Sequence, residues 1–310
     1  MKISLLYNPS DKGINGDNWK LNNRRFFVDE LSKHAELHVV PCIGEYDCKG
    51  LDCDVVILWS LLLKNIVPMG LSGFEDLKCV KVTRAPDAWE IDKFYNETAK
   101  KLGIDLVVSF QSPNCQYQYL NKDIPYKRLV LGIDGDTYKC PKNWDRRYKD
   151  SILSSGVLPG PMSWTWFYHF RWKCAQHPGV HHIAKKDFLG VDYWKLLTQY
   201  RAAIACMTLT SVLKYFEIPM CGCLMFAEST RSNQIEDLGF KDGVNCVFID
   251  RKNHKKRFEQ YLATPDASVW REIAEEGRQL VLDNYTNERQ VKEFVQTVKS
   301  MAAAKSRKVL

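Results

Sequence analysis

The sequence predicts an α/β protein with two layered domains and a helical C-terminal end. The chain has 310 residues, a length that suits two domains of ordinary size. Short continuous apolar runs alternate with segments of helical spacing, and such runs are typical of parallel strands buried on both faces. Hydrophobic residues make up 45% of the chain, enough for two cores. We therefore expect two layered α/β domains.

The N-terminal domain is expected over residues 1–140. A cluster of Pro, Lys, Asn, Asp and Arg at residues 139–147 marks its boundary with the next domain. Helical spacing predicts helices over residues 19–34 and 87–103, and the second ends on a glycine. The expected strands are residues 2–7, 35–41, 53–60, 78–86 and 104–110.

The C-terminal domain is expected over residues 141–310 and repeats this alternation. Three helices are expected to close the chain, from residue 253 to about residue 304. The first expected strand begins at residue 151 and leads into a loop that ends at residue 161. The other expected strands are residues 179–184, 202–208, 223–228 and 245–250. The expected helices between them are residues 162–176, 192–201, 209–220 and 233–239.

The charge of the chain is mildly basic. A net charge of +7 fits phosphate-bearing ligands or an anionic membrane surface, and it is too weak and too spread out to indicate a nucleic-acid partner. The densest run is Arg251–Arg257. This run fits the solvated start of a helix, or else a peripheral contact with anionic lipid headgroups or an acidic acceptor.

The cysteines and the N-terminus indicate a cytoplasmic protein. The 11 cysteines are scattered and include no CxxC pair, which is typical of thiols in a reducing compartment. The N-terminal apolar run is too short for a signal peptide. The longest apolar stretch, Val55–Leu63, is about half of what a membrane span needs.

The strand-helix-strand segment 202–228 is the most informative part of the chain. Thr210 or Ser211 stands where an N-cap of the expected helix would be, and free amides at a helix start form an anion site. Glu217 follows about two turns later, and Gly222 ends the helix. A diphosphate at the helix start would bring a ribose near Glu217. Alternatively, Glu217 is exposed and pairs with Lys214.

Residues 214–250 resemble the donor-binding signature of GT-B glycosyltransferases. The relevant group is glycosyl transferases family 1, including the CgeB-like proteins. The tail over residues 269–294 resembles the end of that family, and the N-terminal half resembles it only in layout. The matching residues of the signature are Lys214, Phe216, Glu217, Cys221, Gly222, Glu228, Gly239, Asp242, Gly243 and Asn245.

The resemblance implies a metal-independent glycosyltransferase whose two Rossmann-like domains face a central cleft. The C-terminal domain would hold a nucleotide-diphosphate sugar as donor substrate, with no further cofactor, and the N-terminal domain a glycan or other hydroxyl-bearing acceptor. The implied donor-binding residues are Ser155, Gly156, Arg171, His182, Thr210, Ser211, Lys214 and Glu217. Many retaining members carry a glutamate eight residues before Glu217. Leu209 stands there instead, so retention or inversion stays open.

Several of these residues also have a plainer interpretation. The Ser155-Gly156 loop lets backbone amides approach phosphate oxygens, or it is a simple turn. Arg171 neutralises the leaving diphosphate, or it is a surface arginine. His182 lies beside the donor, or it is structural; zinc is disfavoured because Pro178 and Gly179 break any helix there.

The catalytic base has one weak candidate. Asp87 opens the helix after a strand, and it serves either as a helix N-cap worth about 1 kcal/mol or as the general base for an acceptor hydroxyl.

Two further functions remain open. The missing first glutamate fits a non-catalytic nucleotide-sugar-binding protein on the same scaffold. Asp134 and Asp136 form a D-x-D triplet, which a metal-dependent GT-A glycosyltransferase would use to hold a divalent ion.

Overall fold

The structure is a computed structural model, and the chain divides into two compact units. The first unit contains residues 1–132 together with residues 287–310, and the second contains residues 133–286. The structure describes residues 1–7, 23–42, 45–59, 71–85, 93–109, 123–130, 133–136, 138, 140, 143–159, 168–184, 191–207, 212–230 and 233–307.

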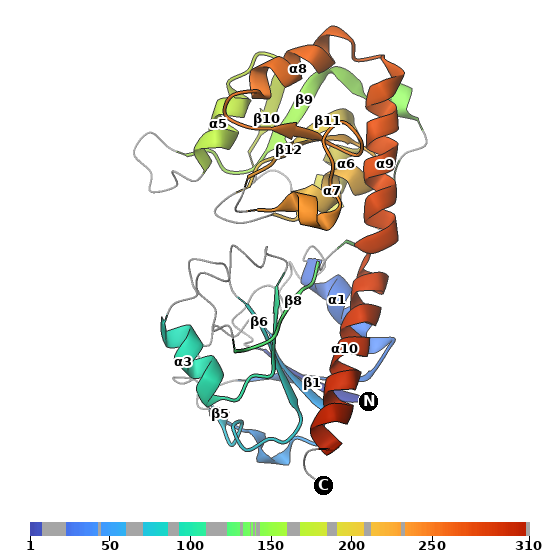
Figure 1. The fold of residues 1–310 in the computed structure, drawn as a ribbon. Helices are drawn as coiled ribbons and strands as arrows, with labels where there is room; N and C mark the ends of the chain where they lie inside the picture. The colour runs from blue at the N-terminus through green and yellow to red at the C-terminus, as the bar shows by residue number, and fades with distance from the viewer. Residues whose placement is uncertain are drawn as a thin grey trace. The chain divides into compact units, whose positions relative to one another are not determined.

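The first unit is built on a six-stranded parallel sheet with the order β2-β1-β4-β6-β7-β8 (Figure 1). A two-stranded sheet of β3 (Tyr46–Asp47) and β5 (Leu71–Ser72) accompanies it. The six strands are β1 (Lys2–Tyr7), β2 (Glu36–Pro41), β4 (Val55–Trp59), β6 (Val80–Arg84), β7 (Leu106–Ser109) and β8 (Tyr126–Arg128).

Helices cover both faces of this sheet. On one face, α1 (Asn23–Ser32) and α10 (Asn287–Arg307) join a buried cluster with alternate residues of β1, β4, β6 and β7. On the other face, α3 (Lys93–Lys101) contributes Tyr95 and Ala99 to a second cluster. The continuous apolar runs of β1 and β4 follow from this, because a strand covered on both faces buries every side chain.

The last helix departs from the expected domain division. Helix α10 was expected within a domain of residues 141–310, but it belongs to the first unit, where Val291, Phe294 and Val298 pack into the core. The division falls at Ile133, a few residues before the expected boundary. The helical spacing of apolar residues shows that α10 must cover a sheet, but it does not show which one.

The second unit has a five-stranded parallel sheet with the order β10-β9-β11-β12-β13. Its strands are β9 (Tyr148–Ser155), β10 (Val180–Ile183), β11 (Tyr200–Ala205), β12 (Leu224–Glu228) and β13 (Val247–Ile249). Its helices are α5 (His169–Ala175), α6 (Val191–Leu197), α7 (Lys214–Met220), α8 (His254–Ala263) and α9 (Ser268–Asn284).

The sheet of the second unit is also buried on both faces. Phe170 of α5, Phe258 of α8 and Ile273 of α9 pack with Ile204 and other side chains of one face. Helices α6 and α7 also contact β11, whose residues Tyr200 to Ala205 are all buried. Because side chains alternate along a strand, a fully buried β11 needs cover on both sides.

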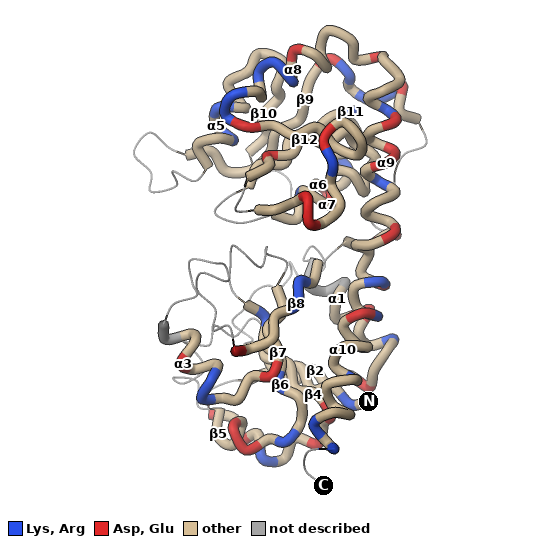
Figure 2. The backbone as a smooth tube through the Cα atoms, in the orientation of Figure 1, with Lys and Arg blue, Asp and Glu red and all other residues tan. Residues whose placement is uncertain are grey.

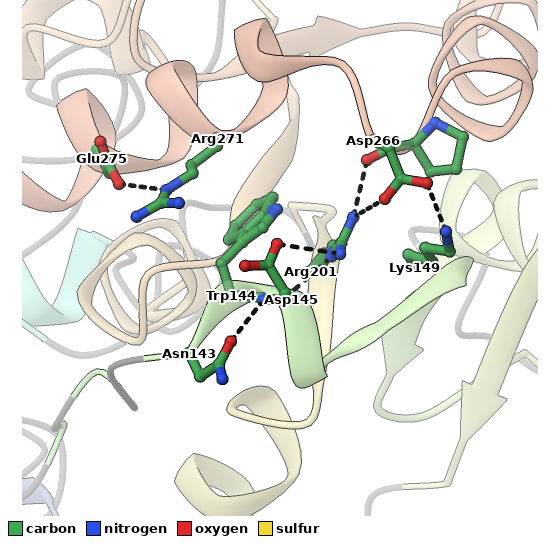
Figure 3. Close-up of polar contacts among 9 residues, drawn as sticks. Asn143, Trp144, Asp145, Lys149, Arg201, Asp266, Arg271 and Glu275 are labelled. Carbon is green, nitrogen blue, oxygen red and sulfur yellow. Dashed lines mark hydrogen bonds and ion pairs between the residues drawn. The ribbon is translucent and has the colours of Figure 1, made fainter.

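A buried arginine fastens the N-terminal edge of this sheet (Figure 3). Arg201, 3% exposed, starts β11 and donates from Nε to the main-chain oxygen of Trp144 at 3.1 Å. Its Nη1 donates to Asp266 Oδ1 at 2.8 Å and to the main-chain oxygen of Pro265 at 3.1 Å. Lys149 of β9 bonds the other oxygen of Asp266. One guanidinium thus joins three segments that are distant in sequence.

The turn after α7 needs glycine at residue 222. The amide of Gly222 donates to Pro219 O at 2.7 Å, and the amide of Cys223 donates to Ile218 O at 3.2 Å, which is the Schellman pattern of a helix end. Gly222 has φ +67°, and a Cβ there would lie 2.5 Å from Cys140 Sγ. The expected end of the helix at Gly222 is therefore confirmed.

We expect Arg201→Ala to lower the free energy of unfolding by about 2–4 kcal/mol, because it removes a buried side chain and its hydrogen bonds to the carbonyl groups of Trp144 and Pro265 and to Asp266. The matched control is Arg271→Ala. Arg271 pairs with Glu275 at 2.7 Å in the same region, but both side chains are more than half exposed, so the expected change is within about 0.5 kcal/mol. Urea unfolding measures both, and equal losses would contradict the buried role of Arg201.

We expect Gly222→Ala to destabilise the protein by about 2–4 kcal/mol, the sum of left-handed backbone strain and a clash with Cys140. Gly243→Ala is the matched control. Gly243 has nearly the same φ, +70°, but a Cβ there would meet nothing within 4 Å. We expect this control to lose only the strain of about 1 kcal/mol. If thermal unfolding gives the same loss for both variants, the clash with Cys140 is not significant.

Candidate functional site

The carboxyl ends of three neighbouring strands form the candidate site of the second unit. Strands β9, β11 and β12 run parallel and end at Ser155, Ala205 and Glu228. Met207, just beyond β11, donates its amide to Glu228 Oε2 at 2.9 Å and so joins two of these ends. In parallel sheets, ligands bind beyond this edge.

Lys214 connects α7 to the end of β9. Its Nζ donates to Ser155 Oγ at 2.9 Å and to the main-chain oxygen of the same residue. Ser155 Oγ in turn donates to the hydroxyl of Tyr193 at 3.2 Å, and Nζ of Lys214 lies 5.7 Å from the centre of the Tyr193 ring. Lys214 and Ser155 were both expected at the donor site, and the structure brings them into contact.

Two cations converge on Gly156. This residue has φ +111°, and a Cβ there would lie 2.9 Å from Nη1 of Arg171 and 3.2 Å from Nζ of Lys214. Any side chain would displace at least one of the two cations, whereas glycine leaves its backbone open beside them. The expected residues Ser155, Gly156, Arg171 and Lys214 therefore form one cluster.

Arg171 is buried, with 6% of its surface exposed. Its Nη1 donates to Val157 O at 3.1 Å, its Nη2 donates to Cys206 O at 3.4 Å, and its guanidinium lies 4.8 Å from the centre of the Tyr168 ring. The alternative of a surface arginine is thus wrong. Within the described part of the chain, Arg171 forms no salt bridge with a carboxylate. A buried cation without a salt bridge favours binding of an anion.

The three histidines of the segment 177–182 each have a different partner. His182 Nδ1 lies 3.1 Å from Ser154 Oγ, at the end of β9. His177 accepts a hydrogen bond from the amide of Gly179, and His181 bonds the hydroxyl of Tyr200. Burial lowers the pKa of His182, and the charges of Lys214 and Arg171 lower it further. His182 therefore lies in the field of the same two cations.

Glu217 is buried, with 7% of its surface exposed, and accepts a hydrogen bond from Tyr138 OH at 2.9 Å. The alternative of an exposed Glu217 that pairs with Lys214 is therefore wrong. The pKa of the Tyr193 hydroxyl is raised, mainly by burial and in addition by the negative charge of Glu217. Glu217 is thus electrostatically close to the group formed by Ser155, Tyr193 and Lys214.

The start of α7 differs from the expectation. The helix begins at Lys214, and its N-cap residue is Leu213, whose side chain makes no capping hydrogen bond. Thr210 and Ser211, expected as N-caps and donor-binding residues, lie outside the described residues, as does Asp87, the expected base. The end of the preceding strand and the start of the helix lie further apart in sequence than the pattern of apolar residues indicated.

Tyr138 and Tyr193 have no motif that marks them in the sequence, yet they contact Glu217 and Ser155. Both come from segments distant in sequence from their partners, so only the tertiary structure reveals them. Glu228 is different, because its position as an acid at the end of a strand was visible in the sequence. Its main-chain oxygen also accepts from Tyr215 OH at 2.8 Å and from Asn233 Nδ2 at 2.6 Å.

The basic run Arg251–Arg257 forms the turn before α8 and its first part, where blue segments gather in Figure 2. His254 is buried, Arg257 pairs with Asp242 at 2.6 Å, and Arg251, Lys252, Lys255 and Lys256 are exposed. The solvated start of a helix is confirmed, and a contact with an anionic membrane stays a prediction. No helix of the described residues is both long and apolar enough to cross a membrane.

Burial raises the pKa of Glu228 to about 7, although the amide of Met207 and the charges of Arg171 and Arg251 act in the opposite direction. At low pH this carboxyl is neutral in both the folded and the unfolded chain. As the pH rises from 4.5 to about 7, the unfolded chain ionises first, and the folded state loses stability over this window.

We expect Glu228→Gln to remove this loss. The amide keeps an oxygen acceptor for Met207, so the variant should match the wild type at pH 4.5. Above pH 7 it should be more stable by up to about 3 kcal/mol, since one unit of pKa corresponds to about 1.4 kcal/mol. Urea unfolding between pH 4.5 and 8 measures the difference. A difference that does not change with pH would contradict a buried, titrating Glu228.

Comparison with known proteins agrees with this architecture. Residues 152–296 match the family described as glycosyl transferase-like. This range covers nearly all of the second unit, including Lys214, Glu217 and Glu228. None of the curated proteins matches the chain in sequence.

Solved structures are similar over almost the whole chain. Sucrose-phosphate synthase from Thermosynechococcus elongatus has a TM-score of 0.65 and 11% identity, covering 98% of this chain and 100% of its own. HepE from Anabaena, in complex with UDP and glucose, has a TM-score of 0.62, 11% identity and coverages of 97% and 100%. A glycosyltransferase from Rickettsia africae has a TM-score of 0.56, 11% identity and coverages of 96% and 98%.

These likenesses confirm the expected fold, because the similar structures are GT-B proteins with two α/β units. They leave no support for the GT-A alternative with Asp134 and Asp136. The likeness to the CgeB-like group in particular stays a prediction. Residues 152–296 thus match the glycosyl transferase-like family, and the chain has the fold of the GT-B structures.

Proposed function

We propose that the protein transfers a sugar from a nucleotide-diphosphate sugar to a hydroxyl group of an acceptor such as a glycan, without a metal ion. The observation that carries this proposal is the convergence of Arg171 and Lys214 on Gly156. Two cations beside an open glycine backbone, at the carboxyl edge of a parallel sheet, suit a diphosphate.

The donor would be held by groups of the second unit. The diphosphate would lie over Gly156, where Arg171 offers a planar guanidinium and Lys214 a compact ammonium group. The ribose would lie near Glu217, a buried carboxylate that accepts a hydrogen bond from Tyr138 OH at 2.9 Å, because carboxylate oxygens accept hydrogen bonds from hydroxyl groups. His182 would border the donor from the neighbouring strand β10.

The same cations would promote the chemistry. When the bond between the anomeric carbon and the diphosphate breaks, negative charge grows on the leaving oxygen. Fixed positive groups at that point stabilise the transition state more than the bound donor. Arg171 and Lys214 would supply the charge that a divalent ion supplies in other glycosyltransferases. The proton of the acceptor hydroxyl needs a base, and Asp87 is the candidate we retain.

UDP and UDP-sugars are the first ligands to test for binding. HepE from Anabaena has a similar fold and binds UDP together with glucose. This likeness supports UDP as the first ligand for a test, whereas the sugar and the acceptor remain for the screen to identify.

We expect one nucleoside diphosphate to raise the melting temperature, and we expect this shift to survive EDTA. At 100 times its dissociation constant, a ligand adds about 2.7 kcal/mol of stability. Lys214→Ala and Glu217→Ala should each raise the dissociation constant by about 10- to 100-fold, which corresponds to the loss of a charge-assisted hydrogen bond. Lys195→Ala is the matched control, because Lys195 is an exposed lysine on α6 that pairs with Asp192 in the same helix.

The outcomes separate the alternatives. Loss of the shift in EDTA would contradict metal independence. No shift with any nucleotide would contradict the donor site as a whole. A shift without hydrolysis of any nucleotide sugar and without transfer to any acceptor would favour the non-catalytic binding protein.

A further inference from the structure

Two cysteines of the first unit lie in direct contact on neighbouring strands. Cys53 precedes β4 and Cys79 precedes β6, and these strands pair in parallel. The two thiols form a hydrogen bond with a distance of 3.8 Å between the sulfur atoms. Both side chains are partly exposed, so small reagents have access to them.

The surroundings of this pair favour a thiolate. The hydrogen bond with Cys79 lowers the pKa of Cys53 to about 7, although burial acts against it, and Ser4 of β1 adds a further hydrogen bond. Lys305 of α10 donates from Nζ to the main-chain oxygen of Cys79 at 3.0 Å. The hydrogen bond with Cys53 and burial raise the pKa of Cys79, although the charges of Lys305 and Lys81 lower it, so Cys53 ionises first. A hydrogen-bond partner and a lowered pKa are typical of reactive thiols.

The other described cysteines lack this combination. Burial raises the pKa of Cys42 to about 11 and that of Cys48 to about 12. Cys174 and Cys206 also form a hydrogen bond with each other, but they are 0% and 1% exposed, so an oxidant cannot reach them. Cys140 is partly exposed, and its sulfur accepts a hydrogen bond from Arg147 Nη2 at 3.4 Å.

We propose that Cys53 and Cys79 are a peroxide-sensitive pair that closes reversibly to a disulfide. The thiolate of Cys53 attacks an oxygen of a hydroperoxide, the O–O bond breaks, and the leaving alkoxide or hydroxide takes up a proton. The sulfenic acid on Cys53 is then attacked by the sulfur of Cys79, and water leaves. In total, two thiols and one hydroperoxide give one disulfide, one alcohol or water molecule, and one further water molecule.

The backbone is compatible with such a bond. The register of β4 and β6 pairs Val55 with Val80, so Cys79 lies opposite Asp54 and next to Cys53 on the adjoining segment. The sulfur atoms must approach from 3.8 Å to about 2.05 Å, which rotation of the side chains can supply. The pair lies at the amino-terminal ends of its strands, and ligands of parallel sheets bind at the opposite ends. This site is therefore independent of the proposed donor site.

The test uses the full-length protein and one equivalent of hydrogen peroxide, followed by peptide mapping without reduction. We expect the first linked peptides to join Cys53 to Cys79, and dithiothreitol to reverse the link. In Cys79→Ser the second thiol is missing, so the sulfenic acid on Cys53 should accumulate and react with dimedone. Cys140→Ser is the matched control with a partly exposed cysteine, and it should still form the link. Cys53→Ser should bind the nucleoside diphosphate as the wild type does.

Alkylation by iodoacetamide gives a second readout that needs no oxidation. At pH 7, Cys53 should react about tenfold faster than an ordinary thiol, and Cys79→Ser should remove this advantage. First oxidation at any other cysteine, a link between two chains, or an ordinary alkylation rate for Cys53 would each overturn the proposal.

Discussion

The candidate site depends on one constraint, the parallel pairing of the strands in the second unit. Each strand must be followed by a connection that returns to the other edge of the sheet, so all carboxyl ends lie at one edge. The side chains at these ends therefore meet without any further interaction to bring them together. The contact of Lys214 with Ser155, and that of Met207 with Glu228, both follow from this geometry.

Among the described residues, the two edges of this sheet differ in whether their buried arginine forms a salt bridge. At the amino-terminal edge, Arg201 is neutralised by Asp266, and its other hydrogen bonds close the turns around it. At the carboxyl edge, Arg171 donates to main-chain oxygens and lies over the Tyr168 ring, and burial raises the pKa of Glu228 to about 7. The first arrangement stabilises the fold, whereas the second costs stability, which is common at functional sites and fits the donor site proposed above.

Much of the fold could be predicted from the sequence, because strands that are buried on both faces consist of consecutive apolar residues. The runs at β1, β4, β11 and β12 could not be mistaken for helices of ordinary length. The start of α7 could not be predicted as well, since the apolar spacing continues through residues that precede the helix. The assignment of α10 to the first unit also could not be predicted, because its apolar face would fit either sheet.

The sequence by itself determined the alternation of strands and helices, the end of α7 at Gly222 and the set of polar residues that follow the strands. These features are local, since they depend on side-chain periodicity and on the backbone freedom of glycine. Only the tertiary structure decided that Arg171 is buried, that Tyr138 bonds Glu217 and that Tyr193 bonds Ser155. It also decided that Cys53 meets Cys79. Each of these contacts joins segments distant in sequence, and their distance and burial depend on packing that no local pattern encodes.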